Sequence, residues 1–279
     1  MDFNFSWETK DKVVLEGKGW MPDNQQPKAI ICMVHGFGEH IGRYEHVAKF
    51  FNTHGYGFIG YDLRGHGKSG GKRGVVPSYD SLMENITEFL ALVHSKFEGI
   101  PIILYGHSMG GNLVTVYTLR ERPSIVKAVI VTSPWLRLTN TPAKPVVMVG
   151  KVIGNLLPSF TLPTKLVPED LSSDLTVGRK YQDDPLVHGK ISSMLFSGVN
   201  DAGQWALLNA NLLKHPLLLM HGNADNITSH KASEEFIRNA PSDLVTYKSW
   251  NGMRHELHNE MVKDKVLEEE LQFIQLHLN

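Results

Sequence analysis

Residues 102–119 read IILYGHSMGGNLVTVYTL, and this stretch decides the fold. Its first four residues are aliphatic or aromatic and predict a buried strand, whereas the segment 111–121 has the pattern of a helix. Between the two, Gly106 and Gly110 flank Ser108 at a spacing of two residues on each side. Glycines at these positions relieve crowding around a serine on a sharp strand-to-helix turn. The stretch therefore predicts a strained turn that presents Ser108 as a nucleophile.

The chain around this stretch alternates short apolar runs with helical patterns. The runs that predict strands lie at 29–36, 55–62, 101–107, 126–133, 216–222 and 244–250. The patterns that predict helices include 44–54, 80–97 and 263–278. Such alternation is typical of a mostly parallel, doubly wound sheet that is buried on both faces. Two earlier segments, 3–9 and 13–21, predict an antiparallel hairpin at the edge of that sheet.

One connection in this α/β pattern is far longer than the others. About 80 residues separate the strand that ends near Ser133 from the one that begins at Pro216, whereas a crossover needs about a dozen. We expect residues 1–135 and 216–279 to form the core, and residues 136–215 to form an inserted helical cap over the carboxyl ends of the strands. Within the cap, the apolar run 146–157 fits either a lid that touches lipid or ordinary cap interior.

Composition excludes some classes of partner. The 279 residues are 42% hydrophobic and 20% charged, with a formal net charge of -1, so charge gives no indication of nucleic-acid binding. The single cysteine, Cys32, cannot form an internal disulfide and suits a reducing compartment. No secretory signal pattern or long apolar segment is present in the sequence. We expect a cytoplasmic protein, with peripheral membrane contact through the cap left open and the oligomeric state unknown.

A serine nucleophile needs a base and an orienting acid. In a fold with this kind of turn, the acid and then the histidine follow the serine along the chain, each after a later strand. Asp225 follows the apolar run PLLLMHGNA, and His255 follows LVTYKSWNGMR. We therefore expect Ser108, His255 and Asp225 to act as nucleophile, base and acid.

The stretch HGFGEH, at residues 35–40, supplies a third element of such a site. It follows a predicted central strand directly, so its backbone N–H groups can face an oxygen that gains negative charge during the reaction. The residue after the nucleophile supplies the second N–H group. These positions predict an oxyanion hole formed by the backbone amides of Phe37 and Met109.

Two other motifs suggest different chemistry and fail on spacing. GYDLRGHGKS resembles a phosphate-binding loop, but Asp62 stands where that motif requires its first glycine. HELHNE suggests a zinc-binding helix, but its histidines, His255 and His258, are three residues apart rather than four. We expect no cofactor and no metal.

These motifs together make the chain similar to the α/β-hydrolase superfamily and, within it, to the monoacylglycerol lipase and lysophospholipase branch. The resemblance rests on HGFGEHIGRYEHVA, YDLRGHGKSGG, GHSMGG, DPLVHGKIS, HGNAD and HELHNE, which extend from about residue 30 to 260. It implies an α/β-hydrolase fold and a serine hydrolase that cleaves a fatty acyl ester from a small polar head group. Carried over by position, it also implies head-group contacts by Glu39, Arg43, Tyr181 and His258.

The function predicted from the sequence is hydrolysis of monoacylglycerols or of similar small-headed monoacyl lipids, such as lysophospholipids, through an acyl-enzyme. The substrate would be a small lipid ester, with no nucleic-acid partner. A carboxylesterase, a peptidase or an acyltransferase on the same scaffold remains an alternative. A non-catalytic binding protein is a further one, although such proteins usually have an incomplete triad. Acyl-chain length and head-group preference stay open.

Overall fold

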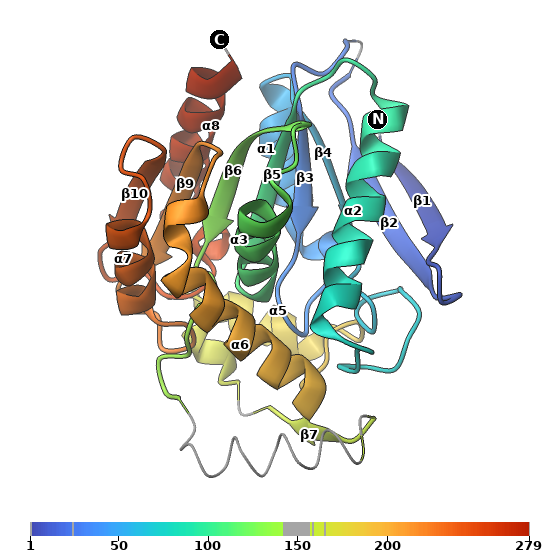
Figure 1. The fold of residues 1–279 in the computed structure, drawn as a ribbon, viewed down its shortest axis with the longest axis vertical. Coiled ribbons are helices and arrows are strands. Elements are labelled where there is room, and N and C mark those ends of the chain that lie inside the picture. The colour runs from blue at the N-terminus through green and yellow to red at the C-terminus, as the bar shows by residue number, and fades with distance from the viewer. Residues whose placement is uncertain (1, 24, 142–156, 158, 165, 279) are drawn as a thin grey trace.

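The strands of the computed structural model form one eight-stranded sheet, in the order β1-β2-β4-β3-β5-β6-β9-β10 (Figure 1). The structure describes all residues except 1, 24, 142–156, 158, 165 and 279. The strands of the sheet are β1 (Asp2–Glu8), β2 (Val14–Trp20), β3 (Ile30–Val34), β4 (Gly57–Tyr61), β5 (Ile102–His107), β6 (Val126–Thr132), β9 (Leu217–Gly222) and β10 (Val245–Trp250). The pairs β1–β2 and β2–β4 are antiparallel, and all the other neighbours are parallel. The predicted mostly parallel sheet is confirmed.

Helices cover both faces of this sheet, as Figure 1 shows. They are α1 (Glu45–Thr53), α2 (Tyr79–Lys96), α3 (Met109–Glu121), α6 (Ser193–Leu208), α7 (His230–Asn239) and α8 (Lys263–Leu278). Successive residues of a strand point to opposite faces, so Cys32 lies in the apolar cluster that includes α2, α3 and α6, and Met33 lies in the one that includes α1 and α8. Burial on both faces explains why the central strands are continuous apolar runs.

The sequence predicts most of these elements to within a few residues. The predicted terminal helix has the bounds of α8, and the predicted hairpin corresponds to β1 and β2, with its turn near Lys12 (φ 67°). Helix α3 begins at Met109, two residues before the predicted start at Gly111. The helix therefore follows Ser108 directly, with no intervening turn residue.

The long connection between β6 and β9 holds short elements outside the main sheet. They are β7 (Thr161–Pro163), the 3-10 helix η2 (Pro168–Asp170), α5 (Leu175–Asp183), β8 (Lys190–Ser192), α6 and the 3-10 helix η3 (Ala210–Leu212). The pattern of residues 192–213 predicts a helix, and α6 lies within that range. The polar stretch that ends at Asp184 shows no helical pattern in the sequence, but it contains α5. Of the apolar run 146–157, only Leu157 lies within the described residues.

The topology brings the ends of several strands to one edge of the sheet. Ser108 follows β5, Asp225 follows β9 and His255 lies five residues beyond the end of β10. Two further 3-10 helices, η1 (Ile41–Tyr44) and η4 (Leu257–Asn259), lie in the loops at this edge. Because parallel strands end on the same side, residues far apart in the sequence meet there. No helix among the described residues is long and apolar enough to cross a membrane.

Candidate active site

Ser108 occupies a strained position between β5 and α3. Its φ of 55° and ψ of -115° fall outside the regions that a residue with a side chain usually adopts. A Cβ atom at Gly106 would lie 2.4 Å from the carbonyl oxygen of Gly110, and one at Gly110 would lie 2.0 Å from that of Val34. Both positions therefore require glycine, and the tight approach holds the Ser108 side chain out from the turn.

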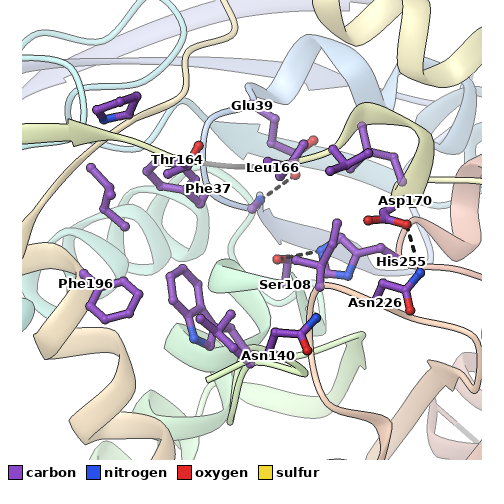
Figure 2. Close-up of a pocket in the computed structure, with 18 of the residues that line it drawn as sticks. Phe37, Glu39, Ser108, Asn140, Thr164, Leu166, Asp170, Phe196, Asn226 and His255 are labelled. Carbon is purple, nitrogen blue, oxygen red and sulfur yellow. Dashed lines mark hydrogen bonds between the residues drawn. The ribbon is translucent and has the colours of Figure 1, made fainter. Parts of the chain in front are cut away.

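A chain of hydrogen bonds joins Ser108 to His255 and Asp225. His255 Nε2 lies 2.9 Å from Ser108 Oγ, and His255 Nδ1 lies 2.7 Å from Asp225 Oδ2; Figure 2 shows the first of these contacts. With Nδ1–H donating to the carboxylate, Nε2 is left to accept the hydroxyl proton of Ser108. The three residues that the sequence predicts as nucleophile, base and acid are thus brought together in the order that nucleophilic catalysis needs.

The charges around His255 favour its protonated form. Burial alone would lower the pKa of His255, but the carboxylates of Asp225, Glu256 and Glu39 outweigh burial and hold this pKa above its ordinary value. Burial would likewise raise the pKa of Asp225, yet the charge and the hydrogen bonds of His255 and His221 lower it strongly. The acid therefore stays ionised while the base can accept a proton.

Asp225 forms hydrogen bonds with other residues in addition to His255. Its Oδ1 accepts hydrogen bonds from the backbone N–H groups of Ile227 (2.7 Å) and Thr228 (3.0 Å). Its Oδ2 lies 3.1 Å from His221 Nε2, and His221 Nδ1 lies 2.7 Å from Ser233 Oγ. Sequence reasoning missed His221. The available signal is a histidine at the end of an apolar strand, four residues before the acid.

The proposed oxyanion donors lie beside Ser108. Met109 is the first residue of α3, and N–H groups at a helix start have no acceptor within the helix. Phe37 lines the cavity next to Ser108, in a loop where Gly38 has a φ of 78°. Glu39 fixes this loop, because its Oε1 accepts the Gly36 N–H at 2.6 Å. Donation by the Phe37 and Met109 amides to a reacting oxygen stays a prediction.

Ser108 and His255 face a cavity of about 720 Å³ (Figure 2). Much of its wall is apolar and comes from the residues between β6 and β9, including Leu138, Ile191 and Phe196. Trp135 adds a further aromatic surface. A cavity of this size, with extensive apolar surface and polar side chains beside Ser108, suits a ligand that has a long apolar part and a polar, reactive end.

Two of the four residues predicted to contact a head group, Glu39 and Tyr181, line this cavity. Arg43 lies outside the lining and donates to Glu256 (2.7 and 2.8 Å) and to Glu39 (2.8 Å). Its guanidinium lies 5.0 Å from the centre of the Tyr181 ring. Three of the five guanidinium N–H groups donate to the two carboxylates, so Arg43 holds them in place, and direct contact between Arg43 and a substrate stays a prediction.

His258, the fourth predicted contact, is also placed away from the cavity wall. Its side chain is fully buried and stacks on Tyr44, with ring centres 4.7 Å apart. Its ring centre lies 4.9 Å from that of His107. Burial and the neighbouring His107 and His46 lower the pKa of His258 well below its ordinary value. Its position suits packing behind the site rather than contact with a substrate.

The chain is similar to several known proteins. The family described as serine aminopeptidase, S33 (Hydrolase_4) matches residues 25–261. A monoacylglycerol lipase of Mycolicibacterium smegmatis is 32% identical over 260 residues, which cover 93% of this chain and 92% of that protein. A crystal structure of Paleococcus ferrophilus monoacylglycerol lipase has a TM-score of 0.86 and 30% identity, covering 94% of this chain and 99% of that one.

A larger relative contains a similar region. An uncharacterized abhydrolase domain-containing protein of Dictyostelium discoideum is 37% identical over 268 residues. The match covers 95% of this chain but only 28% of that protein. The chain therefore corresponds to about a quarter of this relative.

The raised pKa of His255 gives a pH prediction. Reaction of Ser108 with a fluorophosphonate needs neutral His255, so the labelling rate should be full at high pH and fall as the pH drops through that raised pKa. We expect the midpoint above 6.5, the ordinary value for histidine. Labelling rates measured across pH test this, and Asp225→Asn should lower the midpoint. A midpoint at or below 6.5 in the unmodified protein would contradict the inferred effect of the carboxylates.

The contact between His221 and Asp225 gives a second prediction. His221→Phe removes the donor to Asp225 and should lower kcat for an ester by about tenfold, the cost of one hydrogen bond to a charged group. It should also raise the midpoint of the pH profile, because the less neutralised carboxylate stabilises protonated His255 more strongly. His221→Gln retains an amide donor and should recover part of the loss. If the Phe and Gln variants have the same kcat and pH profile, His221 contributes only packing.

Proposed function

The chain belongs to the serine aminopeptidase S33 family of α/β hydrolases, and on this premise we propose that it hydrolyses the acyl ester of monoacylglycerols. The observation that carries the proposal is the hydrogen-bonded chain from Ser108 through His255 to Asp225, at the wall of a mostly apolar cavity. The names of the relatives support the substrate class. The geometry supports the reaction type.

The reaction would proceed through an acyl-enzyme. Ser108 Oγ attacks the ester carbonyl while His255 Nε2 takes its proton, and Asp225 holds the imidazole in the required tautomer. The negative charge on the tetrahedral oxygen would be stabilised by the amides of Phe37 and Met109. His255 then returns the proton to the leaving glycerol oxygen. A water molecule, activated by the same histidine, releases the fatty acid from Ser108.

The two kinds of surface in the cavity match the two parts of a monoacylglycerol. Leu138, Ile191 and Phe196 offer apolar area for one acyl chain, which is bound mainly through the hydrophobic effect. Glu39 and Tyr181 offer polar groups for the free hydroxyls of glycerol. We infer that residues 136–215 act as a cap that closes the cavity over the substrate.

The cap has an exposed apolar surface near the cavity. Half of the strongly exposed large apolar side chains among the described residues belong to the segment 157–175, namely Leu157, Phe160, Leu162, Val167 and Leu175. Leu162 and Val167 also line the cavity. Exposed apolar patches of this kind mark interaction surfaces, so we infer that this part of the cap contacts lipid aggregates while substrate enters.

Peptide hydrolysis is a second candidate, because the description of the matching family names an aminopeptidase. The triad geometry alone does not distinguish an ester from an amide, since both react through a tetrahedral intermediate. Turnover of an aminoacyl amide faster than that of a monoacylglycerol would favour this alternative.

Replacement of the nucleophile is the first test of the proposal. Ser108→Ala should abolish fluorophosphonate labelling and lower kcat for mono-oleoylglycerol by about 10⁶-fold, because the triad acts as a unit. The exposed Ser242→Ala variant is the control and should retain both. Circular dichroism and thermal unfolding should show an intact fold in each variant. Persistent labelling of folded Ser108→Ala would mean that another residue is the nucleophile.

The limited room of this partly enclosed cavity predicts selectivity for substrates with one acyl chain. Each further acyl chain replaces a glycerol hydroxyl and needs additional room. It also leaves a polar group of the site without a hydrogen-bond partner, which costs about 1–3 kcal/mol of binding free energy per group. We expect kcat/KM to fall from mono- to di- to trioleoylglycerol when each is presented in the same neutral detergent. Equal or faster turnover of the triacyl substrate would overturn the proposed substrate class.

A further inference from the structure

The cavity wall formed by the described residues carries carboxylates and no lysine or arginine. Its charged lining residues are three carboxylates, those of Glu39, Asp170 and Glu256. No lysine or arginine lines the cavity among the residues that the structure describes, a set that does not include Lys165. The histidines at the wall are His107, whose pKa burial lowers well below its ordinary value, and His255. Figure 2 shows Glu39 and Asp170 among the residues around Ser108 and His255.

One arginine, Arg43, is shared between two of these carboxylates. Arg43 lies 2.8 Å from Glu39 Oε2 and 2.7 Å from Glu256 Oε1, and it does not line the cavity. The side chains of Glu39 and Glu256 are each only 3% exposed. One guanidinium between two carboxylates leaves this group of three with a net charge of minus one. Three of its five N–H groups donate to these carboxylates, so the positive charge of Arg43 is directed toward them rather than toward the cavity.

The third carboxylate lies on another part of the wall. Asp170, in η2, accepts the Asn226 side-chain N–H at 2.9 Å. This contact is neutral, and the guanidinium of the nearby Arg254 donates to backbone carbonyls of the same segment. The raised pKa of His255, to which Glu256 and Glu39 contribute, indicates that the negative potential reaches the reacting groups.

We infer that the cavity selects lipid esters by the charge of the head group, admitting neutral and cationic head groups and excluding anionic phosphate monoesters. The inference rests on the proposed function, because it concerns which monoacyl esters the same Ser108 site hydrolyses. It separates monoacylglycerols from lysophosphatidic acids, two classes that share one acyl chain and a glycerol unit.

The physical reason is that an anionic head group would lose water and meet only like charge. A phosphate monoester carries a charge of about -1.5 to -2 near neutral pH. Inside a partly enclosed cavity, repulsion between fixed charges is stronger and less screened by salt than it is in water. The groups that commonly compensate a bound phosphate, namely Arg and Lys side chains, do not line the described wall. A quaternary ammonium group would instead be attracted to the carboxylates.

The experiment compares three substrates with the same acyl chain: mono-oleoylglycerol, oleoyl lysophosphatidic acid and oleoylcholine. All are presented in one neutral detergent at a fixed pH and ionic strength. We expect kcat/KM for the phosphate ester to be at least about 30-fold lower than kcat/KM for mono-oleoylglycerol. We expect kcat/KM for the choline ester to be at least about tenfold higher than kcat/KM for the phosphate ester. Uncleavable ether analogues, assayed as competitive inhibitors, should give the same order of binding and so separate binding from leaving-group chemistry.

A charge variant tests the origin of this selectivity. Asp170→Asn keeps the shape of the side chain and removes one negative charge, so it should reduce the preference for mono-oleoylglycerol over the phosphate ester by at least about threefold. Asp243→Asn makes the same change at an exposed position outside the cavity lining and should leave the ratio unchanged.

These experiments distinguish failure of the charge inference from failure of the proposed function. Comparable turnover of the phosphate ester and mono-oleoylglycerol would overturn the charge inference while leaving the proposed function in place. An unchanged ratio in Asp170→Asn would overturn the assignment of selectivity to the described wall. Failure to hydrolyse mono-oleoylglycerol at all, with the fold intact, would instead overturn the proposed function.

Discussion

The close approach of helix α3 to strand β3 is the constraint on which the site depends. The backbone at Gly110 lies so near the carbonyl oxygen of Val34 that a Cβ atom has no room, and Gly106 faces the first turn of the same helix equally closely. This packing allows α3 to begin at Met109, directly after Ser108. The positive φ of Ser108 strains the backbone, and packing of the surrounding core maintains this conformation. A free amide at the helix start then lies next to the nucleophile.

Burial makes the charges around this serine effective. Asp225 and His255 are almost completely buried, so their interaction is weakly screened: it lowers the pKa of Asp225 and raises that of His255. Several hydrogen bonds hold the Asp225 carboxylate, including one from His221. The group formed by Arg43, Glu39 and Glu256 repeats this arrangement at the cavity wall, where it fixes the loop before η1 to the loop after His255. Glu39 and Glu256, which help to raise the pKa of His255, also belong to the wall that we propose repels anionic head groups.

The sequence predicts the sheet and the triad because both depend on local patterns. Apolar runs specify buried strands, and the glycines around Ser108 specify the turn, so these features can be read without tertiary information. Chain order then identifies Asp225 and His255. The surroundings of the site depend on contacts between distant segments. Arg43 and Glu256 lie 213 positions apart, and no sequence pattern shows that the guanidinium lies between two carboxylates and outside the cavity lining.

Helix α5 is not predicted from the sequence, because its segment is mostly polar and only Gly178 and Tyr181 are buried.

In the proposed reaction, Ser108 carries the acyl group between two half-reactions. Rapid acid quenching of the protein during turnover of mono-oleoylglycerol, followed by mass spectrometry of the intact chain and its peptides, would detect this acyl group. We expect an oleoyl ester on the peptide that contains Ser108, formed at a rate no slower than turnover and removed by hydroxylamine. Turnover with an acyl group on a different residue, or without any covalent intermediate under conditions that accumulate one on an authentic serine esterase, would contradict it.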